Sequence, residues 1–138
     1  MLLVVDANIL FAALIKSGFT RSIFLLADHE FFAPEFSVQE FKKHLDELQK
    51  KTGLEKEKLE EIFDELIESA GIKLVPFEDF ENKKSLAENI SPDLDDVAYI
   101  ALALHLDCDL WSNDKALKKQ SQVKIISTKE LFEEMKKE

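Results

Sequence analysis

The sequence predicts an α/β fold in which about five parallel strands form one sheet. Short apolar runs alternate along the chain with segments whose apolar residues recur at helical spacing. Prolines stop two of the apolar runs, at Pro34 and Pro76. Strands that alternate with helices in this way favour a parallel sheet with right-handed crossovers. We expect residues 1–138 to form a single domain, which is long enough to bury an ordinary core.

The elements follow one another with short connections and without an internal repeat. The expected strands are residues 2–5, 31–33, 72–75, 109–112 and 123–126. The expected helices are residues 8–15, 20–28, 37–52, 55–69, 78–89, 95–106, 114–117 and 128–136.

Residues with capping preferences support these boundaries. Thr20 and Thr128 are expected to be helix N-caps. Ser37 and Glu40 have the spacing of a capping box, which predicts one continuous helix after them. Gly71 follows the helix over residues 55–69, as glycine commonly does at helix ends.

Composition excludes several protein classes. No run of 18 apolar residues occurs, so we expect no membrane span, and the N-terminus enters a strand without the basic region of a signal peptide. Cys108 is the single cysteine, which excludes an internal disulfide and fits a cytoplasmic protein. Three unclustered glycines disfavour a phosphate-binding loop, and the lack of a Cys/His cluster disfavours a zinc site.

The net charge of −10 argues against tight, non-specific nucleic-acid binding, because phosphate contacts need Lys and Arg. Bound divalent ions would neutralise part of this charge. The balance fits a weak, selective nuclease or a protein with a basic partner.

Acidic residues stand where predicted strands end and helices begin. Asp6 follows the first strand and Asp114 follows the fourth, so both lie at the carboxyl edge of the sheet, where ligands of open α/β sheets bind. Glu40, Asp95 and Asp96 stand at helix starts. Clustered carboxylates repel one another and need a cation, and a site made only of oxygen ligands selects Mg²⁺ or Mn²⁺.

Each acid also has a purely structural explanation. Asp6, Asn8 and Asp114 suit helix N-caps, and Asp95 and Asp96 complement a helix dipole. Taken together, the acids argue for a metal site more strongly than any one of them does alone. Asp96 opens a helix that is apolar nearly all round and has no Lys or Arg to balance it, and a half-buried unpaired carboxylate is costly.

Four segments together resemble the PIN domains, the family that includes the VapC-type toxin ribonucleases. These segments are residues 4–8, 37–41, 96–103 and 110–114. The resemblance implies a three-layer α/β/α fold and hydrolysis of RNA that depends on Mg²⁺ or Mn²⁺. It also implies an acidic quartet of Asp6, Glu40, Asp96 and Asp114.

Other polar residues have supporting places in this interpretation. Asn8 and Ser112 fall on the supporting polar positions of the family, although Ser112 stands where the family often has Thr. Asp95 beside Asp96 leaves two candidates for the third acidic ligand. His44 follows Glu40 by four residues and is interpreted as a surface histidine, with the rim of the site as the alternative.

The resulting hypothesis is a metal-dependent endoribonuclease with one or two ions. Asp6 and Asp96 are expected to bind metal directly, while Glu40 and Asp114 bind a second ion or orient the attacking water. The cations near the sheet edge are expected to contact the substrate backbone, namely Lys16, Arg21 and Lys115.

Several alternatives stay open. The fold could be an inactive binding module, or a phosphoacceptor receiver domain, which the single acid after the first strand disfavours. A toxin would pair with a small basic antitoxin, whereas a processing nuclease would need none. The resemblance also favours a homodimer.

Overall fold

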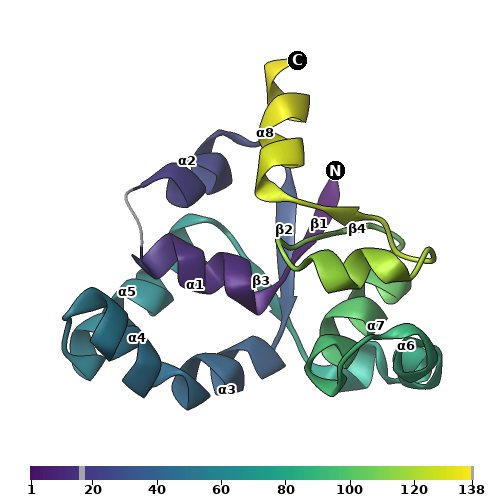
Figure 1. The fold of residues 1–138 in the computed structure, drawn as a ribbon, viewed down its shortest axis with the longest axis horizontal. Coiled ribbons are helices and arrows are strands. Elements are labelled where there is room, and N and C mark those ends of the chain that lie inside the picture. The colour runs from purple at the N-terminus through teal and green to yellow at the C-terminus, as the bar shows by residue number, and fades with distance from the viewer. Residues whose placement is uncertain (16–17, 138) are drawn as a thin grey trace.

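Five parallel strands form one sheet in the order β3-β2-β1-β4-β5 (Figure 1). The structure is a computed structural model that describes residues 1–15 and 18–137. The strands are β1 (Leu2–Val5), β2 (Glu30–Pro34), β3 (Lys73–Val75), β4 (Asp109–Trp111) and β5 (Ile125–Ile126). Every neighbouring pair is parallel. The predicted parallel sheet of about five strands is confirmed.

Helices connect the strands throughout the described residues. The α-helices are α1 (Ala7–Ile15), α2 (Phe19–Leu26), α3 (Phe36–Lys43), α4 (Leu45–Thr52), α5 (Lys56–Ser69), α6 (Lys84–Ile90), α7 (Val97–Leu106) and α8 (Thr128–Lys136). Short 3₁₀ turns add η1 (Phe77–Asp79), η2 (Glu81–Lys83), η3 (Leu94–Asp96) and η4 (Lys115–Lys119).

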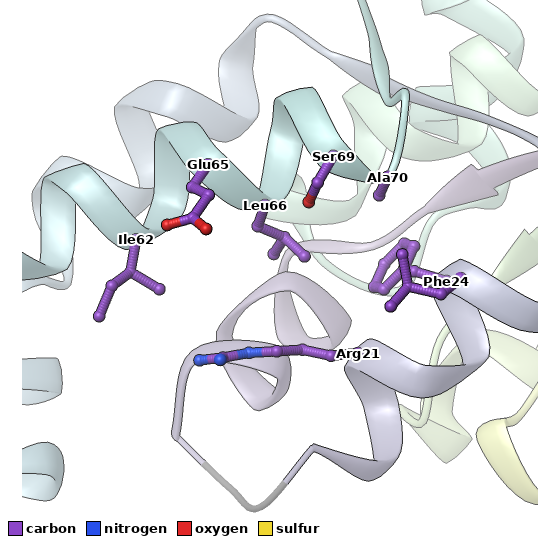
Figure 2. A pocket seen from close by; sticks show the side chains of 8 residues that line it. Arg21, Phe24, Ile62, Glu65, Leu66, Ser69 and Ala70 are labelled. Atoms are coloured by element: carbon purple, nitrogen blue, oxygen red, sulfur yellow. The ribbon is translucent and has the colours of Figure 1, made fainter.

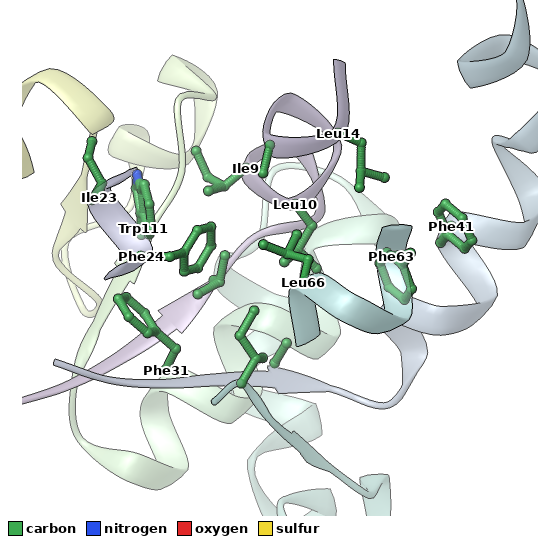
Figure 3. Close-up of a cluster of buried hydrophobic side chains, with 14 of the residues drawn as sticks. Ile9, Leu10, Leu14, Ile23, Phe24, Phe31, Phe41, Phe63, Leu66 and Trp111 are labelled. Atoms are coloured by element: carbon green, nitrogen blue, oxygen red, sulfur yellow. The ribbon is translucent and has the colours of Figure 1, made fainter. Parts of the chain in front are cut away.

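Helices cover both faces of the sheet and make the three-layer α/β/α fold that the resemblance implied. Successive residues of β1 point to opposite faces, so Leu3 and Val5 join one core while Val4 joins the other. The first core packs the sheet against α1, α2, α5 and α8 (Figure 3). The second packs it against α6 and α7, which lie together on the other side in Figure 1. A strand buried on both faces is apolar throughout, as β1 is.

Aromatic side chains fix the end of β4, where the site begins. The ring of Phe24 packs between Phe31 and Trp111, at centroid distances of 4.9 and 4.8 Å (Figure 3). Trp111 Nε1 donates a hydrogen bond of 3.0 Å to Thr128 Oγ1. The residue after Trp111 is Ser112, so this packing sets where the polar residues leave the sheet.

The predicted helix over residues 37–52 is wrong as a single element, because it breaks at His44 into α3 and α4. The backbone N–H of His44 still reaches the carbonyl oxygen of Glu40, but its φ of −100° and ψ of 8° turn the chain. The ring Nδ1 of His44 lies 2.8 Å from the same carbonyl oxygen and satisfies it a second time. No glycine or proline marks this break.

Several predicted boundaries also need correction. The capping box at Ser37 does not form, because its hydroxyl bonds to Tyr99 instead, and a capping box forms at Ser127 and Glu130. Ser127 rather than Thr128 is therefore the N-cap of α8. Gly18 rather than Thr20 precedes α2.

Two elements are much shorter than predicted. The segment 78–89 begins as the turns η1 and η2 and becomes an α-helix only at Lys84. The fifth strand covers Ile125–Ile126 alone. The backbone N–H of Val123 donates to the side chain of Gln120 rather than to the sheet, which explains why the strand starts late.

No single helix in the described ranges is long and apolar enough to cross a membrane. The bent pair of α1 and α2 passes the same test only when the two helices are taken together.

Candidate active site

An acidic hollow lies where β1, β2 and β4 end at the carboxyl edge of the sheet. Because the chain leaves β1 toward β2 on one side and returns to β4 on the other, this is the position where ligands of open α/β sheets bind. The hollow has a volume of about 420 Å³ and is open to solvent. Its lining residues are Asp6, Ala7, Asn8, Phe11, Glu40, His44, Glu47, Asp93, Asp95, Asp96 and Asp114. All four acids of the predicted quartet, together with Asn8 and Asp95, are thus brought together.

Asp6 is held in place by two direct hydrogen bonds, one of which is supported by a third residue. The carboxylate is only 7% exposed. Ser112 Oγ donates a hydrogen bond of 2.6 Å to Asp6 Oδ2, and the backbone N–H of Ala7 donates one of 2.8 Å to Oδ1. Asn8 Nδ2 in turn donates to Ser112 Oγ over 3.2 Å. Asn8 and Ser112 therefore act as supports that orient Asp6.

Asp114 reaches the hollow from the end of β4. Its backbone N–H donates to Ser112 Oγ over 3.1 Å, which ties it to the support of Asp6. Its own Oδ1 accepts from the backbone N–H of Ala116 over 3.0 Å. The carboxylate therefore is a helix cap, as its structural explanation proposed, and also lines the hollow.

Glu40 depends on Tyr99, a residue that the sequence reasoning missed. Tyr99 donates its hydroxyl proton to Glu40 Oε1 over 2.7 Å. Ser37 Oγ lies 3.1 Å from the same hydroxyl and must be the donor there, because the single phenolic proton points to Glu40. One signal was present in the sequence: Tyr99 is the only tyrosine and lies three residues after Asp96 in a buried helix.

Asp96 carries a strongly perturbed carboxyl. It is the last residue of η3 and precedes the buried helix α7. Partial burial, followed by repulsion from Asp6, Asp114, Asp93 and Asp95, raises the pKa of Asp96 to about 7. Its neighbour Asp95 is exposed but lines the same hollow, so both candidates for the third ligand are present.

Burial is also the main cause of the raised pKa values of Asp6 and Glu40. The hydrogen bond from Ser112 lowers the pKa of Asp6, and the one from Tyr99 lowers that of Glu40, but neither offsets burial. Repulsion from Asp114 raises the pKa of Asp6 further. Three carboxyls therefore resist ionisation together, and a cation among them would relieve that cost.

The chemistry of these donors fits a hard divalent cation, since every candidate ligand is an oxygen. In the part of the chain that the structure describes, no three His, Cys, Asp or Glu side chains are close enough to hold one ion. Both oxygens of Asp6 and one of Glu40 are occupied by hydrogen bonds. Ion binding would therefore draw the carboxylates of opposite walls toward one another.

His44 lies at the wall of the acidic hollow rather than on the remote surface. Its Nδ1 lies 2.8 Å from the carbonyl oxygen of Glu40 and must carry the proton, since a carbonyl only accepts. Its ring packs against that of Phe11 at a centroid distance of 5.3 Å. The favoured interpretation of His44 as a remote surface histidine is therefore wrong, and the alternative, a place at the rim of the site, agrees with the structure.

The cations that were predicted to contact substrate are dispersed. Arg21 lies at another hollow, between α2 and α5, where Figure 2 shows it opposite Glu65 and Ser69. Its Nε donates a hydrogen bond of 2.6 Å to the carbonyl oxygen of Ala13. Lys115 is exposed and follows Asp114 directly, while Lys16 lies outside the described residues.

The sequence model of one protein family, described as the PIN domain, matches residues 4–136. This chain belongs to the PIN domain family. PIN domains are generally nucleases and generally use divalent metal ions. The match covers all four segments that carried the resemblance.

A solved structure shows the same fold as this PIN domain. It is the crystal structure of VapBC2 from Rickettsia felis bound to a DNA fragment from their promoter. The TM-score is 0.68 at 13% identity, over 92% of this chain and 98% of the other. A comparison with curated protein sequences found no match.

Proposed function

We propose that this PIN domain is an endoribonuclease that hydrolyses RNA phosphodiester bonds with Mg²⁺ or Mn²⁺. One observation supports the proposal above the others: Asp6, Glu40, Asp96 and Asp114 arrive from different elements and line one open hollow. Structural capping alone gives no reason for four acids to meet. Their unfavourable ionisation favours a site that is completed by cations.

The chain's own residues would orient the ligands. Ser112 and the N–H of Ala7 fix the Asp6 carboxylate, and Tyr99 fixes one oxygen of Glu40. Asp96 and Asp114 complete the set. A bound divalent ion would supply Lewis acidity, which lowers the pKa of water and neutralises charge on the phosphate. The second oxygen of Glu40 stays available to orient water or bind metal.

The openness of the hollow supports cleavage within a chain rather than at an end. An RNA strand can pass across a hollow that is open to solvent, whereas a closed pocket would accept only a terminus or a free nucleotide. No Lys or Arg is among the described residues that line the hollow, so metal ions would supply most of the attraction for phosphate.

The experiment is RNA cleavage by the purified protein in Mg²⁺ or Mn²⁺, with EDTA and Asp6→Asn as controls. Structured and single-stranded RNAs are both included. Asp64→Asn is the matched control, because Asp64 is an exposed carboxylate on α5 outside the hollow. Cleavage that needs metal and Asp6, but not Asp64, supports the proposal.

If no RNA is cleaved, thermal melting with and without Mn²⁺ distinguishes the possible reasons. A higher Tm in Mn²⁺ that Asp6→Asn reduces would leave metal binding supported and point to a narrow RNA target. No cleavage and no Tm change would favour the inactive module. Labelling by acetyl phosphate would instead favour the phosphoacceptor domain.

A role as the cytoplasmic toxin of a toxin–antitoxin pair is supported by the fold shared with VapBC2 and by the net charge of −10. That charge complements a small basic antitoxin. Induced expression is expected to arrest growth, and Asp6→Asn is expected to abolish the arrest. Normal growth with active, metal-dependent cleavage would favour a processing nuclease.

Light scattering of the purified protein tests the expected homodimer.

A further inference from the structure

A second hollow of about 340 Å³ lies beside the acidic one, and neither the acids nor the proposed chemistry uses it. We call it the phenylalanine groove. Three aromatic rings and three polar side chains define it: Phe36, Phe77, Phe80, Glu35, Gln39 and Glu78. The groove is thus apolar within and polar at its margin.

The phenylalanine groove and the acidic hollow are lined by residues that are neighbours in the sequence, although no described residue lines both. Gln39 lines the groove and precedes Glu40, which lines the hollow. Ala98 lines the groove two residues after Asp96. The Phe36 ring lies 6.5 Å from that of Tyr99, at an interplanar angle of 61°. A nucleotide next to a phosphate in the acidic hollow would therefore have its base within reach of the groove.

Phe77 gives the groove a partly exposed aromatic ring. Its side chain is 40% exposed although it is large and apolar. It packs edge-on against the buried Phe80, at a centroid distance of 5.5 Å and an angle of 82°. This contact holds the ring in one orientation and leaves part of it open. Aromatic faces of this kind bind single strands by stacking on bases.

The polar margin favours a base over a phosphate. Glu35 and Glu78 are exposed carboxylates that repel phosphate but accept N–H donors. Among the described residues, no hydrogen bond or ion pair engages either carboxylate or the amide of Gln39. Amino groups of adenine, cytosine and guanine can donate to these acceptors. Uracil lacks an amino group. Its one ring donor, N3–H, lies between two carbonyl oxygens, which would approach the carboxylates unfavourably.

We propose that the phenylalanine groove binds one unstacked, amino-bearing base of the RNA strand, next to the phosphate that is cleaved. The inference deepens the proposed function and rests on it for the identity of the strand. Lys84 Nζ lies 6.0 Å from the centre of the Phe77 ring and supplies positive charge for the attached backbone. The groove would select the base, and the acidic hollow would perform the cleavage.

The first test is binding of six-nucleotide RNAs to Asp6→Asn protein, which is not expected to cleave them. Oligo(A) and oligo(C) are expected to bind about 5-fold or more tightly than oligo(U). Phe77→Ala in the same background is expected to weaken oligo(A) and oligo(C) binding by about 5- to 100-fold, the range of one lost stacking contact. Phe77→Leu should act in the same direction, because it keeps apolar volume without the aromatic face.

Phe19→Ala is the matched control. Phe19 is a 50% exposed phenylalanine that packs on Phe132, away from both hollows. Its loss is expected to leave RNA binding unchanged. Thermal melting of each variant shows whether weaker RNA binding comes from the altered groove or from unfolding of the protein.

The second test maps cut ends in a randomised RNA. The wild type is expected to favour A, C or G over U at one fixed position beside the cut. Phe77→Ala and Gln39→Ala should weaken that preference, while the Tm gain in Mn²⁺ stays unchanged because no metal ligand is altered. Equal binding of oligo(A) and oligo(U), or an unaltered preference in Phe77→Ala, would overturn the groove assignment alone.

The two proposals can fail separately. Base-selective binding that Phe77→Ala removes, without cleavage and without a Mn²⁺ effect on Tm, would support the groove and overturn the nuclease. Metal-dependent cleavage without any base preference would support the nuclease and overturn the groove.

Discussion

Asp96 shows how a residue's surroundings can turn an ordinary carboxyl into a group that titrates near neutrality. Its own helix offers no cation, and four other aspartates add their repulsion to partial burial. Its pKa therefore rises from 3.8 to about 7. The folded, metal-free protein keeps a proton there over a pH range in which the unfolded chain has lost it.

We predict that the metal-free protein loses stability as the pH rises from 5 to 8. A carboxyl whose pKa is raised on folding stabilises the folded state fully below pH 3.8, and that contribution is lost as the pH passes about 7. The pKa values of Asp6 and Glu40 are also raised on folding, so these two carboxyls add to the loss of stability at higher pH. The pKa of Glu130, lowered to about 2 mainly by its hydrogen bond with Lys118, adds nothing between pH 5 and 8. Denaturant unfolding in EDTA measures the slope.

Asp96→Asn should flatten that slope and raise the stability of the metal-free protein at pH 8. The gain is expected to be on the order of 1 kcal/mol, because solvent screens a half-exposed carboxyl. Asp64→Asn should keep the slope of the wild type, since Asp64 faces solvent on α5. An Asp96→Asn protein with an unchanged slope would show that other groups carry the pH dependence.

Tyr99→Phe should weaken catalysis by about 10-fold without unfolding the protein. The substitution keeps the ring in the core but removes the hydrogen bond that orients Glu40 and lowers its pKa. The acid limb of the pH–rate profile should therefore move to higher pH. Ser37→Ala removes only the hydrogen bond from Ser37 to the Tyr99 hydroxyl, so it should weaken catalysis less than Tyr99→Phe does. A uniform loss at every pH would contradict a role in positioning Glu40.

At the scale of elements, apolar runs were enough to locate the strands. A strand that is covered by helices on both faces of the sheet is made of apolar residues throughout. Helix breaks were harder to predict. The turn at His44 depends on where α4 packs against α1 and α5, and no local breaker marks it. The site shows the same division. Asp6 and Asp114 could be found from their places after strands, and Glu40 and Asp96 from their places at helix starts. The contacts of Tyr99 with α3 depend on how α7 packs.

The capping boxes show why local patterns mislead. Ser37 and Glu40 have the right spacing, but the fold directs both side chains to Tyr99. Ser127 and Glu130 have the same spacing and no competing partner in the core, so they form the reciprocal bonds. The capping pattern thus located the start of α3 near Phe36, but it predicts the capping hydrogen bonds only where no core residue competes for the two side chains.

Ser127→Ala should lower the free energy of unfolding by about 1 kcal/mol, because it removes the N-cap of α8. The loss should leave cleavage unchanged, since α8 does not line the hollow. Ser121→Ala is the matched control: Ser121 is exposed and caps no helix. An equal loss in both variants, measured by denaturant unfolding, would mean that the cap contributes nothing.

At the scale of the whole molecule, a net charge of −10 sets this protein apart from proteins that hold RNA through a basic surface. Lys118 and Lys124 are engaged by Glu130, Asp109 and Glu134, so they are less available to phosphate. Long-range electrostatics should slow the approach of RNA, and attraction should be confined to the metal site and a few nearby lysines.

We therefore predict that cleavage at fixed Mg²⁺ depends weakly on NaCl. Affinity for RNA falls steeply with salt only when many phosphates are neutralised by Lys and Arg, with a slope of about −0.7 per contact on single strands. Here added salt also screens the repulsion between two polyanions, which works in the opposite direction. From about 20 to 150 mM NaCl, kcat/KM should change by less than about 3-fold. A loss of 10-fold or more would indicate a basic RNA-binding surface, on this chain or on a second copy.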